Sequence, residues 1–338
     1  MATMADVARL AGVSLSTVSY ALSGERPISD ATRQKVLAAM DELEFSPNAL
    51  ARGLASRRSG IIALLLPTDE SDADPFMAEI IVAAAEAARS SGYHLLLWTE
   101  PIGSGGELRE LVRHGLIDGA LVLAVRLDDQ RIPALTRAGI PFTLIGRTAD
   151  DVHSYADADE EQAAAVTMDH LVSLGHRHVA FVGPPIDQID QGYGIVVRLI
   201  DGLTAAAETN GVALSIHSCE RTADAGRSVA RHVLDADPRT SAAIVMNDPA
   251  LGGFIGAARD RGLDVPTDLS VIGLFSTSLA ASLTSPPLTT VSPVPAHIGR
   301  LAAENLVAEL RRPDEGPRRD LVSVRLSIRD STTRARSA

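Results

Sequence analysis

Short apolar runs alternate with longer helix-like stretches over most of this chain, from Ser59 onward. The first run, residues 61–66, contains no polar residue. Continuous runs of this kind are typical of strands that are buried on both faces of a parallel sheet. The alternation restarts near Gln162. The pattern therefore predicts an α/β core made of two doubly wound lobes, each with a parallel sheet.

The expected elements follow from this periodicity. Strands are predicted at 61–66, 93–98, 119–123, 141–145, 178–182, 242–246 and 270–274, and helices at 76–91, 107–114, 162–174, 197–210 and 251–261. Open α/β sheets bind ligands outside the carboxyl ends of their strands, and two such lobes leave a cleft between them. We therefore expect a small-molecule site between the lobes.

A different pattern precedes this core, because residues 3–24 contain two short helix patterns joined at Gly12. Thr3 is the candidate N-cap of the first helix, and Ser14 follows the turn as the cap of the second. The positions expected to face inward are Val7, Ala8, Ala11, Val18 and Leu22. This is a helix-turn-helix, which fits a DNA major groove, although a plain helical hairpin in a larger bundle has a similar pattern.

The outward face of the second helix consists of Leu15, Ser16 and Tyr20, where a recognition helix meets base edges. A third helix is predicted from the cap Ser29, and its expected inward residues are Val36, Leu37, Met40 and Leu43. Residues 47–58 follow as a short segment that is too brief to form a stable isolated helix. We expect this segment to order only when something holds it.

These motifs make the first sixty residues resemble the LacI/GalR family of bacterial transcription regulators. The matching positions are Asp6-Val7-Ala8, Ala11-Gly12-Val13-Ser14, Thr17-Val18-Ser19, Thr32-Arg33, Pro47-Asn48, Ala51-Arg52 and Leu54. The resemblance implies a hinge helix at 47–56, paired with its copy from a second subunit, in which Leu54 beside Ala51 wedges into the minor groove. The alternative is that Leu50 and Leu54 are an ordinary apolar pair in a linker. Phosphate contacts are expected from Thr3, Ser14, Thr17, Asn48 and Arg52.

Tyr20 departs from the family, whose members commonly have Arg after Thr-Val-Ser. A bidentate arginine contact to guanine is therefore missing. Tyrosine offers one hydroxyl and an apolar ring edge, which suit a thymine methyl group or a single polar base edge. We expect the operator to differ at this position.

The core also resembles the family's sugar-sensing part, which is similar to periplasmic binding proteins. The matching positions are His170-Leu171, Leu174-Gly175-His176-Arg177, Asn247-Asp248, Gly262-Leu263, Val265-Pro266, Ser270-Val271-Ile272-Gly273, Leu288-Thr289-Thr290-Val291, Ile298-Gly299 and Arg329-Asp330-Ser331-Thr332. The resemblance implies that the chain crosses between the lobes three times, near Asp159, Val291 and Leu321. The predicted divisions are a DNA-binding head (1–46), a hinge (47–58) and a core (59–338) whose lobe 1 is 59–158 with 292–320 and lobe 2 is 159–291 with 321–338.

Carrying the family's pocket over to this sequence gives seven expected effector-binding residues. They are Phe76, Arg126, Arg147, Arg198, Asn247, Asp248 and Phe275. Some of these have an ordinary alternative: Phe76 as a core aromatic, and Arg126, Arg147 and Arg198 as surface charges. After Val271-Ile272-Gly273, where many members have an aromatic residue and two Asp, this chain has Leu274-Phe275-Ser276. The expectation that the ligand is a free neutral sugar is therefore weaker. Arg147 with Arg198 would suit a phosphorylated or carboxylated ligand.

Charge and composition agree with an intracellular regulator. The chain has a net charge of −12, yet residues 1–60 carry +1 and the remainder −13, so only the head is suited to approach DNA phosphates. Cys219 is the only cysteine, which excludes an intrachain disulfide and a cysteine metal cluster. We expect a cytoplasmic protein, since neither a secretory signal nor a membrane-spanning apolar stretch occurs in the sequence.

Two familiar catalytic motifs bear on whether the chain is an enzyme. Neither a Gly-x-Ser-x-Gly elbow nor a His-Glu-x-x-His site occurs in the sequence, and we expect no enzyme activity, cofactor or metal. The sequence thus predicts a homodimeric transcription regulator, most simply a repressor, that binds a palindromic double-stranded operator under the control of a small-molecule effector. The alternative is a small-molecule sensor whose DNA-binding head no longer functions.

Overall fold

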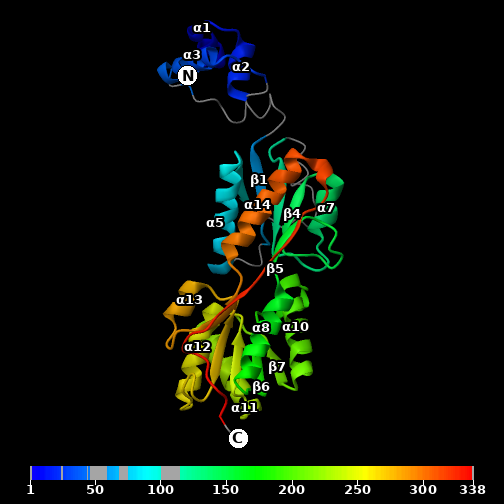
Figure 1. The fold of residues 1–338 in the computed structure, drawn as a ribbon, viewed down its shortest axis with the longest axis vertical. Coiled ribbons are helices and arrows are strands. Elements are labelled where there is room, and N and C mark those ends of the chain that lie inside the picture. Colours follow the sequence, from blue (N-terminus) through cyan, green and yellow to red (C-terminus); the bar gives the residue numbers. More distant parts are fainter. Residues whose placement is uncertain are drawn as a thin grey trace.

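The structure is a computed structural model that describes residues 2–23, 26–43, 45, 59–67, 75–99 and 115–336. Figure 1 shows a small helical domain that contains the N-terminus, followed by two α/β lobes, with the C-terminus at the end of the second lobe. Two expected elements, the hinge at 47–58 and the helix at 107–114, lie outside the described residues.

Three helices form the N-terminal domain. They are α1 (Met4–Ala11), α2 (Leu15–Ser23) and α3 (Asp30–Glu42). Each contributes one fully buried valine to a shared core, namely Val7, Val18 and Val36. The expected inward position of Leu37 is wrong, since it is 45% exposed. Ala39 takes the buried position because it lies three residues after Val36, on the same face of the helix.

The turn between α1 and α2 has the caps that the sequence predicts. Thr3 and Asp6 form a reciprocal capping box at the start of α1. Gly12 has φ +64°, a left-handed conformation that favours glycine at a helix end. Ser14 Oγ then accepts a hydrogen bond from the backbone N–H of Thr17 at 3.1 Å, which begins α2.

Lobe 1 contains a six-stranded, fully parallel sheet with the order β11-β5-β4-β3-β1-β2. Its elements are β1 (Ile61–Leu65), α5 (Pro75–Ser90), β2 (His94–Trp98), β3 (Gly119–Leu123), α7 (Arg131–Ala138), β4 (Phe142–Ile145), β5 (Tyr155–Ala158), α14 (Pro295–Arg311), the short 3-10 helix η3 (Pro313–Glu315) and β11 (Arg319–Val322). The uniformly apolar sequence of β1 is explained by its burial on both faces. Ile62 and Leu64 pack toward α5 and α14, whereas Ala63 and Leu65 pack toward α7, so both faces of the sheet are covered.

Lobe 2 repeats this architecture with the strand order β12-β10-β9-β8-β6-β7. Its elements are α8 (Glu160–Ser173), β6 (His178–Val182), α9 (Ile186–Asp190), α10 (Gly194–Asn210), β7 (Ala213–His217), α11 (Ala223–Ala236), β8 (Ala242–Val245), α12 (Asp248–Asp260), β9 (Ser270–Leu274), α13 (Ser278–Leu283), β10 (Thr289–Ser292) and β12 (Arg325–Ser327). Phe181 packs with α8 and α10, and Val182 packs with α11 and α12 on the other face. Edge strand β12 runs antiparallel to β10, so this sheet departs from the fully parallel expectation.

The chain passes between the lobes three times. Strand β5 of lobe 1 leads into α8 of lobe 2, β10 of lobe 2 leads into α14, which packs on α5, and β11 of lobe 1 leads into β12 of lobe 2. The three connections fall at residues 159, 293–294 and 323–324. Figure 1 shows these segments side by side between the lobes. The lobes are therefore linked covalently by three neighbouring connections.

Several elements have too weak a sequence pattern to be predicted. Strand β5 contains Asp157, an uncommon strand residue, and β7 lies at a sheet edge where most of its residues are exposed. Helices α7, α11 and α14 were also absent from the predicted list. Helix α11 nevertheless has a readable pattern, because Thr222 caps it and Ala230, Val233 and Leu234 recur on its buried face.

Candidate functional site

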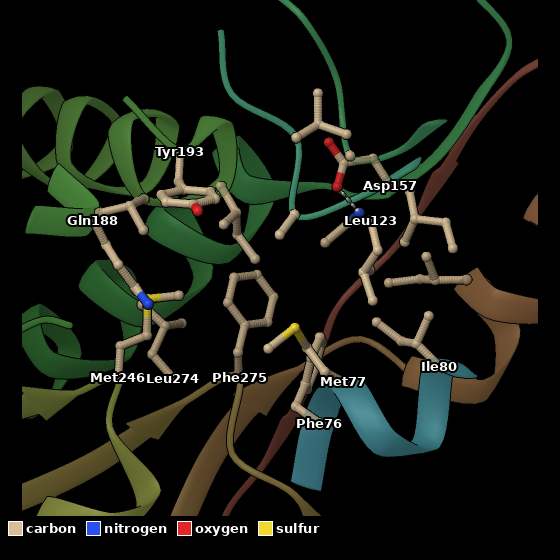
Figure 2. Close-up of a pocket in the computed structure, with 18 of the residues that line it drawn as sticks. Phe76, Met77, Ile80, Leu123, Asp157, Gln188, Tyr193, Met246, Leu274 and Phe275 are labelled. Carbon is tan, nitrogen blue, oxygen red and sulfur yellow. Dashed lines mark hydrogen bonds between the residues drawn. The ribbon is translucent and has the colours of Figure 1, made fainter. Parts of the chain in front are cut away.

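A cavity of about 120 Å³ lies between the lobes, at the carboxyl ends of the central strands. Lobe 1 contributes side chains from α5 and from the ends of β3 and β4. Lobe 2 contributes side chains from α10 and from the segments after β8 and β9. Figure 2 shows that these side chains converge on one space from both sides. This is the position at which open α/β sheets bind ligands.

Unusual backbone conformations mark three of the strand ends that line the cavity. Ala124 after β3 has φ +52°, Gly146 after β4 has φ +118°, and Phe275 after β9 has φ +55°. Residues with a side chain rarely adopt positive φ, and such residues gather at ligand sites. At Phe275 this conformation ends the strand, while the aromatic side chain forms part of the cavity wall.

Aromatic side chains meet across the cleft. The ring centroids of Phe76, at the start of α5, and Phe275 lie 5.6 Å apart, with the ring planes tilted by 56°. In the view of Figure 2, Phe275 lies between Tyr193 and Phe76. All three residues are at least 93% buried. Tilted aromatic pairs at this distance are favourable, so the contact helps to hold the lobes together.

The polar groups of the cavity wall are bound within the protein. Asn247 caps α12, because its side-chain oxygen accepts from Ala250 N–H at 3.3 Å, and its amide donates to the carbonyl oxygen of Cys219 at 2.8 Å. The carboxylate of Asp248 accepts from Thr277 N–H at 3.2 Å. The structure thus brings Asn247 and Asp248 to the cavity wall together with Phe76 and Phe275.

A buried ion-pair cluster lies beside the cavity. Arg147 donates to Asp157 at 3.1 Å and to Glu160 at 2.6 Å, and the Glu160 side chain is fully buried. Burial and the nearby charge of Asp157 raise the pKa of Glu160, Arg147 opposes both effects, and the net result is a pKa of about 8. The other carboxyl oxygen of Glu160 has no hydrogen-bond partner among the described residues. One guanidinium therefore serves two carboxyl groups, which favours the protonated form of Glu160.

A second contact between the lobes borders this cluster. Residues 126 and 193 form an antiparallel bridge, with Gly194 N–H donating to Val125 O at 2.9 Å. Arg198 donates to the carbonyl oxygens of Arg147 at 3.2 Å and Thr148 at 2.8 Å. The two segments of the chain approach so closely that a β-carbon added at Gly194 would lie 2.9 Å from Arg147 O. Only glycine fits this position without a shift.

The three arginines expected to bind the effector make contacts within the protein. Arg126 donates to Gln191 and Tyr193 and lies over the Tyr193 ring, Arg147 is held by two carboxylates, and Arg198 binds two carbonyl groups. None of the three belongs to the cavity wall in the described structure. An anion held by Arg147 and Arg198 stays a prediction, and in this structure both guanidinium groups join the lobes.

Other cavity residues were missed by the sequence reasoning. Asp157, Gln188, Tyr193 and Arg221 all line the cavity. No acidic residue directly follows β9, but Asp157 of β5 supplies an acidic group to the cavity wall. The only available signal was a polar residue at the end of a short apolar stretch. Gln188 lies in the short helix α9, for which the sequence gave no signal.

The residues that we expect to face DNA bases lie on α2. Leu15 is 54% exposed and Ser16 is exposed, whereas Tyr20 is half-buried, with the Arg26 guanidinium 5.3 Å from its ring centroid. The hydroxyls of Thr3, Ser14 and Thr17 all lie at helix starts. The remaining expected DNA contacts, Asn48, Ala51, Arg52 and Leu54, lie outside the described residues.

Comparison with known proteins agrees with this architecture. Residues 3–48 match the family described as bacterial regulatory proteins, lacI family, and residues 168–332 match the periplasmic binding protein-like domain. The transcriptional regulator MalR of Streptomyces coelicolor is 34% identical over 91% of this chain and 90% of its own length. The chain belongs to the LacI family. It is a DNA-binding transcription regulator with a periplasmic-binding-protein-like core.

Other relatives of this LacI-family chain extend over nearly its whole length. The regulator CelR of Thermobifida fusca is 30% identical over 97% of this chain and 98% of its own length. A solved complex of CelR with cellobiose has a TM-score of 0.72 at 28% identity and covers 98% of this chain and all of that one. The Lac repressor dimer bound to operator and the anti-inducer ONPF has a TM-score of 0.82 at 25% identity and covers 98% of this chain and 99% of that one. In the described part of the chain, no helix is both long and apolar enough to cross a bilayer.

Proposed function

We propose that this LacI-family regulator is a homodimeric repressor whose affinity for a palindromic operator is set by a small molecule bound between the lobes. The observation that carries the proposal is the cavity itself, since its walls come from both lobes and three chain crossings join them at one edge. A ligand that touches both walls binds the closed arrangement better than an open one. Such a difference in affinity is what a ligand needs to shift a conformational equilibrium.

The DNA contacts that we propose lie on the head and the hinge. Leu15, Ser16 and Tyr20 would face base edges in the major groove, and Leu54 beside Ala51 would enter the minor groove between the two subunits. The proposed phosphate contacts are Thr3, Ser14, Thr17, Asn48 and Arg52. The charge distribution supports this division, because residues 1–60, which hold the head and the hinge, carry +1 while the remainder carries −13 and is repelled by DNA.

We propose the domain divisions 1–46, 47–58 and 59–338 for the head, hinge and core. The protein would bind the ligand and release it unchanged, because the similar proteins MalR and CelR are transcription regulators. We place this activity in the cytoplasm, where the chain meets chromosomal DNA.

The direct test is to select bound sequences from a random duplex pool with the full-length protein at about physiological salt. We expect a palindrome with a central step that can be kinked. Replacement of Leu54 by Ala should weaken binding to this sequence, whereas Arg52→Ala should weaken all DNA binding and reduce its salt dependence. If no sequence is enriched, with or without cell metabolites, the chain is a sensor whose head has lost its DNA role.

A further inference from the structure

The ring of Tyr20 carries an arginine side chain beside α2. The guanidinium carbon of Arg26 lies 5.3 Å from the centroid of the Tyr20 ring. Tyr20 is half-buried in the helix, whereas Arg26 is exposed in the segment between α2 and α3. A guanidinium over an aromatic face at this distance is attracted by the ring and stacks on it. The contact therefore holds the Arg26 guanidinium next to the helix.

This stacked pair lies on the face of α2 that we propose for DNA bases. Ser16 and Tyr20 are four residues apart in one helix, so their side chains share a face. Ser16 and its neighbour Leu15 are exposed at the start of that helix. The second helix of a helix-turn-helix lies in the major groove and presents this part of its surface to base edges. Tyr20 thus brings a guanidinium from the following segment to the surface that reads sequence.

The contact with Tyr20 uses only the face of the Arg26 guanidinium. Stacking leaves the N–H groups at the edge of the guanidinium plane, and these form a rigid fork of donors. In the described part of the head, Arg9 is held by the carboxylate of Asp6 at 2.8 Å, but no carboxylate pairs with Arg26. The fork of Arg26 matches the O6 and N7 acceptors that guanine presents in the major groove.

The arrangement also supplies what tyrosine lacks at position 20. A tyrosine has one hydroxyl and cannot form the two parallel hydrogen bonds that arginine forms with guanine. Arg26, six residues later in the chain, provides that fork from the face of the Tyr20 ring. A phosphate needs only a positive charge nearby, whereas a base edge needs a planar fork in a fixed orientation. The orientation that the ring imposes therefore favours a base as the partner of Arg26.

We infer that Arg26 reads a guanine in each half of the operator, and that the Tyr20 ring is the positioning residue that orients its guanidinium. The inference rests on the proposed function, because it needs a head that binds DNA in the major groove. It adds a specificity-determining residue that lies outside the recognition helix, in the segment that leads to α3.

Selection from random duplexes with full-length variants tests the role of Arg26. The wild type should enrich guanine at a position of each half-site where Arg26→Ala loses the preference, by at least about fivefold. Arg9→Ala is the matched control, because it removes a head arginine that is paired with Asp6, and it should select the wild-type sequence. If Arg26→Ala binds all sequences more weakly but keeps every base preference, Arg26 contacts a phosphate and the inference is overturned.

Two substitutions at residue 20 separate the ring from the hydroxyl. Tyr20→Phe keeps the ring and should keep the guanine preference at the Arg26 position. Tyr20→Leu removes the ring and should lower that preference toward the value for Arg26→Ala. A loss of head stability would weaken binding to every sequence without changing this preference. An unchanged guanine preference in Tyr20→Leu would contradict the positioning role.

The same selection separates this inference from the proposed function. If the wild type enriches no palindrome, the proposed function is wrong. If it enriches a palindrome whose bases are all unaffected by Arg26→Ala, the proposed function stands and the inference is wrong. Arg26 is exposed, so this variant keeps the test decisive even where a substitution of half-buried Tyr20 lowers the stability of the head.

Discussion

Arg147 and Glu160 join the two lobes through a hydrogen bond of 2.6 Å beside the first chain crossing. Arg147 follows β4 of lobe 1, whereas Glu160 is the first residue of α8 in lobe 2. The Glu160 side chain is fully buried, and Asp157 shares the same guanidinium. Because the pair lies at the boundary of the lobes, its charge state influences both stability and the approach of the lobes.

The first prediction concerns the pH dependence of stability. Burial raises the pKa of Glu160 to about 8 from its usual value of 4.5, so the folded state favours the protonated form. The free energy of unfolding should therefore fall as the pH rises from about 4.5 to about 8, by up to a few kcal/mol from this group. Glu160→Gln mimics the protonated form and should remove this part of the dependence in denaturant titrations.

A neighbouring glutamate provides the control for that measurement. Glu161 lies beside Glu160 in the first turn of α8 but is exposed, so Glu161→Gln should keep the pH dependence of the wild type. If Glu160→Gln and the wild type lose stability in parallel between these pH values, Glu160 is ionised throughout and the prediction is wrong.

A second prediction concerns the close approach at Gly194. Gly194→Ala places a β-carbon 2.9 Å from the carbonyl oxygen of Arg147, which forces the lobes apart or shifts the chain. We expect a loss of about 1–3 kcal/mol in the free energy of unfolding and weaker effector binding. Gly252→Ala is the control, because that helical glycine has open space around it and should gain up to about 1 kcal/mol. Equal effects of the two substitutions would contradict the steric argument.

A third prediction separates the two roles of Ser14. Its hydroxyl caps α2, so Ser14→Ala should destabilise the head by about 1 kcal/mol. Ser14→Asp keeps a side-chain acceptor for the cap but adds a negative charge where a DNA phosphate is expected. We expect Ser14→Asp to retain thermal stability while its DNA affinity falls more than that of Ser14→Ala. DNA affinity that follows stability in both variants would exclude a phosphate contact at this position.

A fourth prediction concerns the base that α2 reads through residue 20. Tyr20→Arg supplies a guanidinium that can bind the O6 and N7 atoms of guanine. Selection from random duplexes should then enrich guanine at one position of each half-site, with discrimination of about 1–3 kcal/mol against other bases. Lys35, which is exposed on α3, provides the comparison. Lys35→Gln should leave the selected sequence unchanged. An unchanged sequence for Tyr20→Arg would place residue 20 away from the bases.

The helix-turn-helix, the two-lobed α/β core and the family of the chain could all be predicted before the fold was known. These properties depend on local features, namely caps at Thr3 and Ser14, the glycine turn, and buried strands whose residues are apolar on both faces. Such features act over a few residues, so a linear reading detects them.

The partners of the polar groups around the cleft could not be predicted in this way. Arg147 and Arg198 have the same chemistry as anion-binding residues, and their structural role appears only once Glu160 and the carbonyl oxygens of residues 147 and 148 are beside them. The pairing of Phe76 with Phe275 likewise joins two distant segments at the edges of different lobes. Folding brings these residues together through the packing of whole sheets and helices, and that information is not contained in the spacing of any one segment.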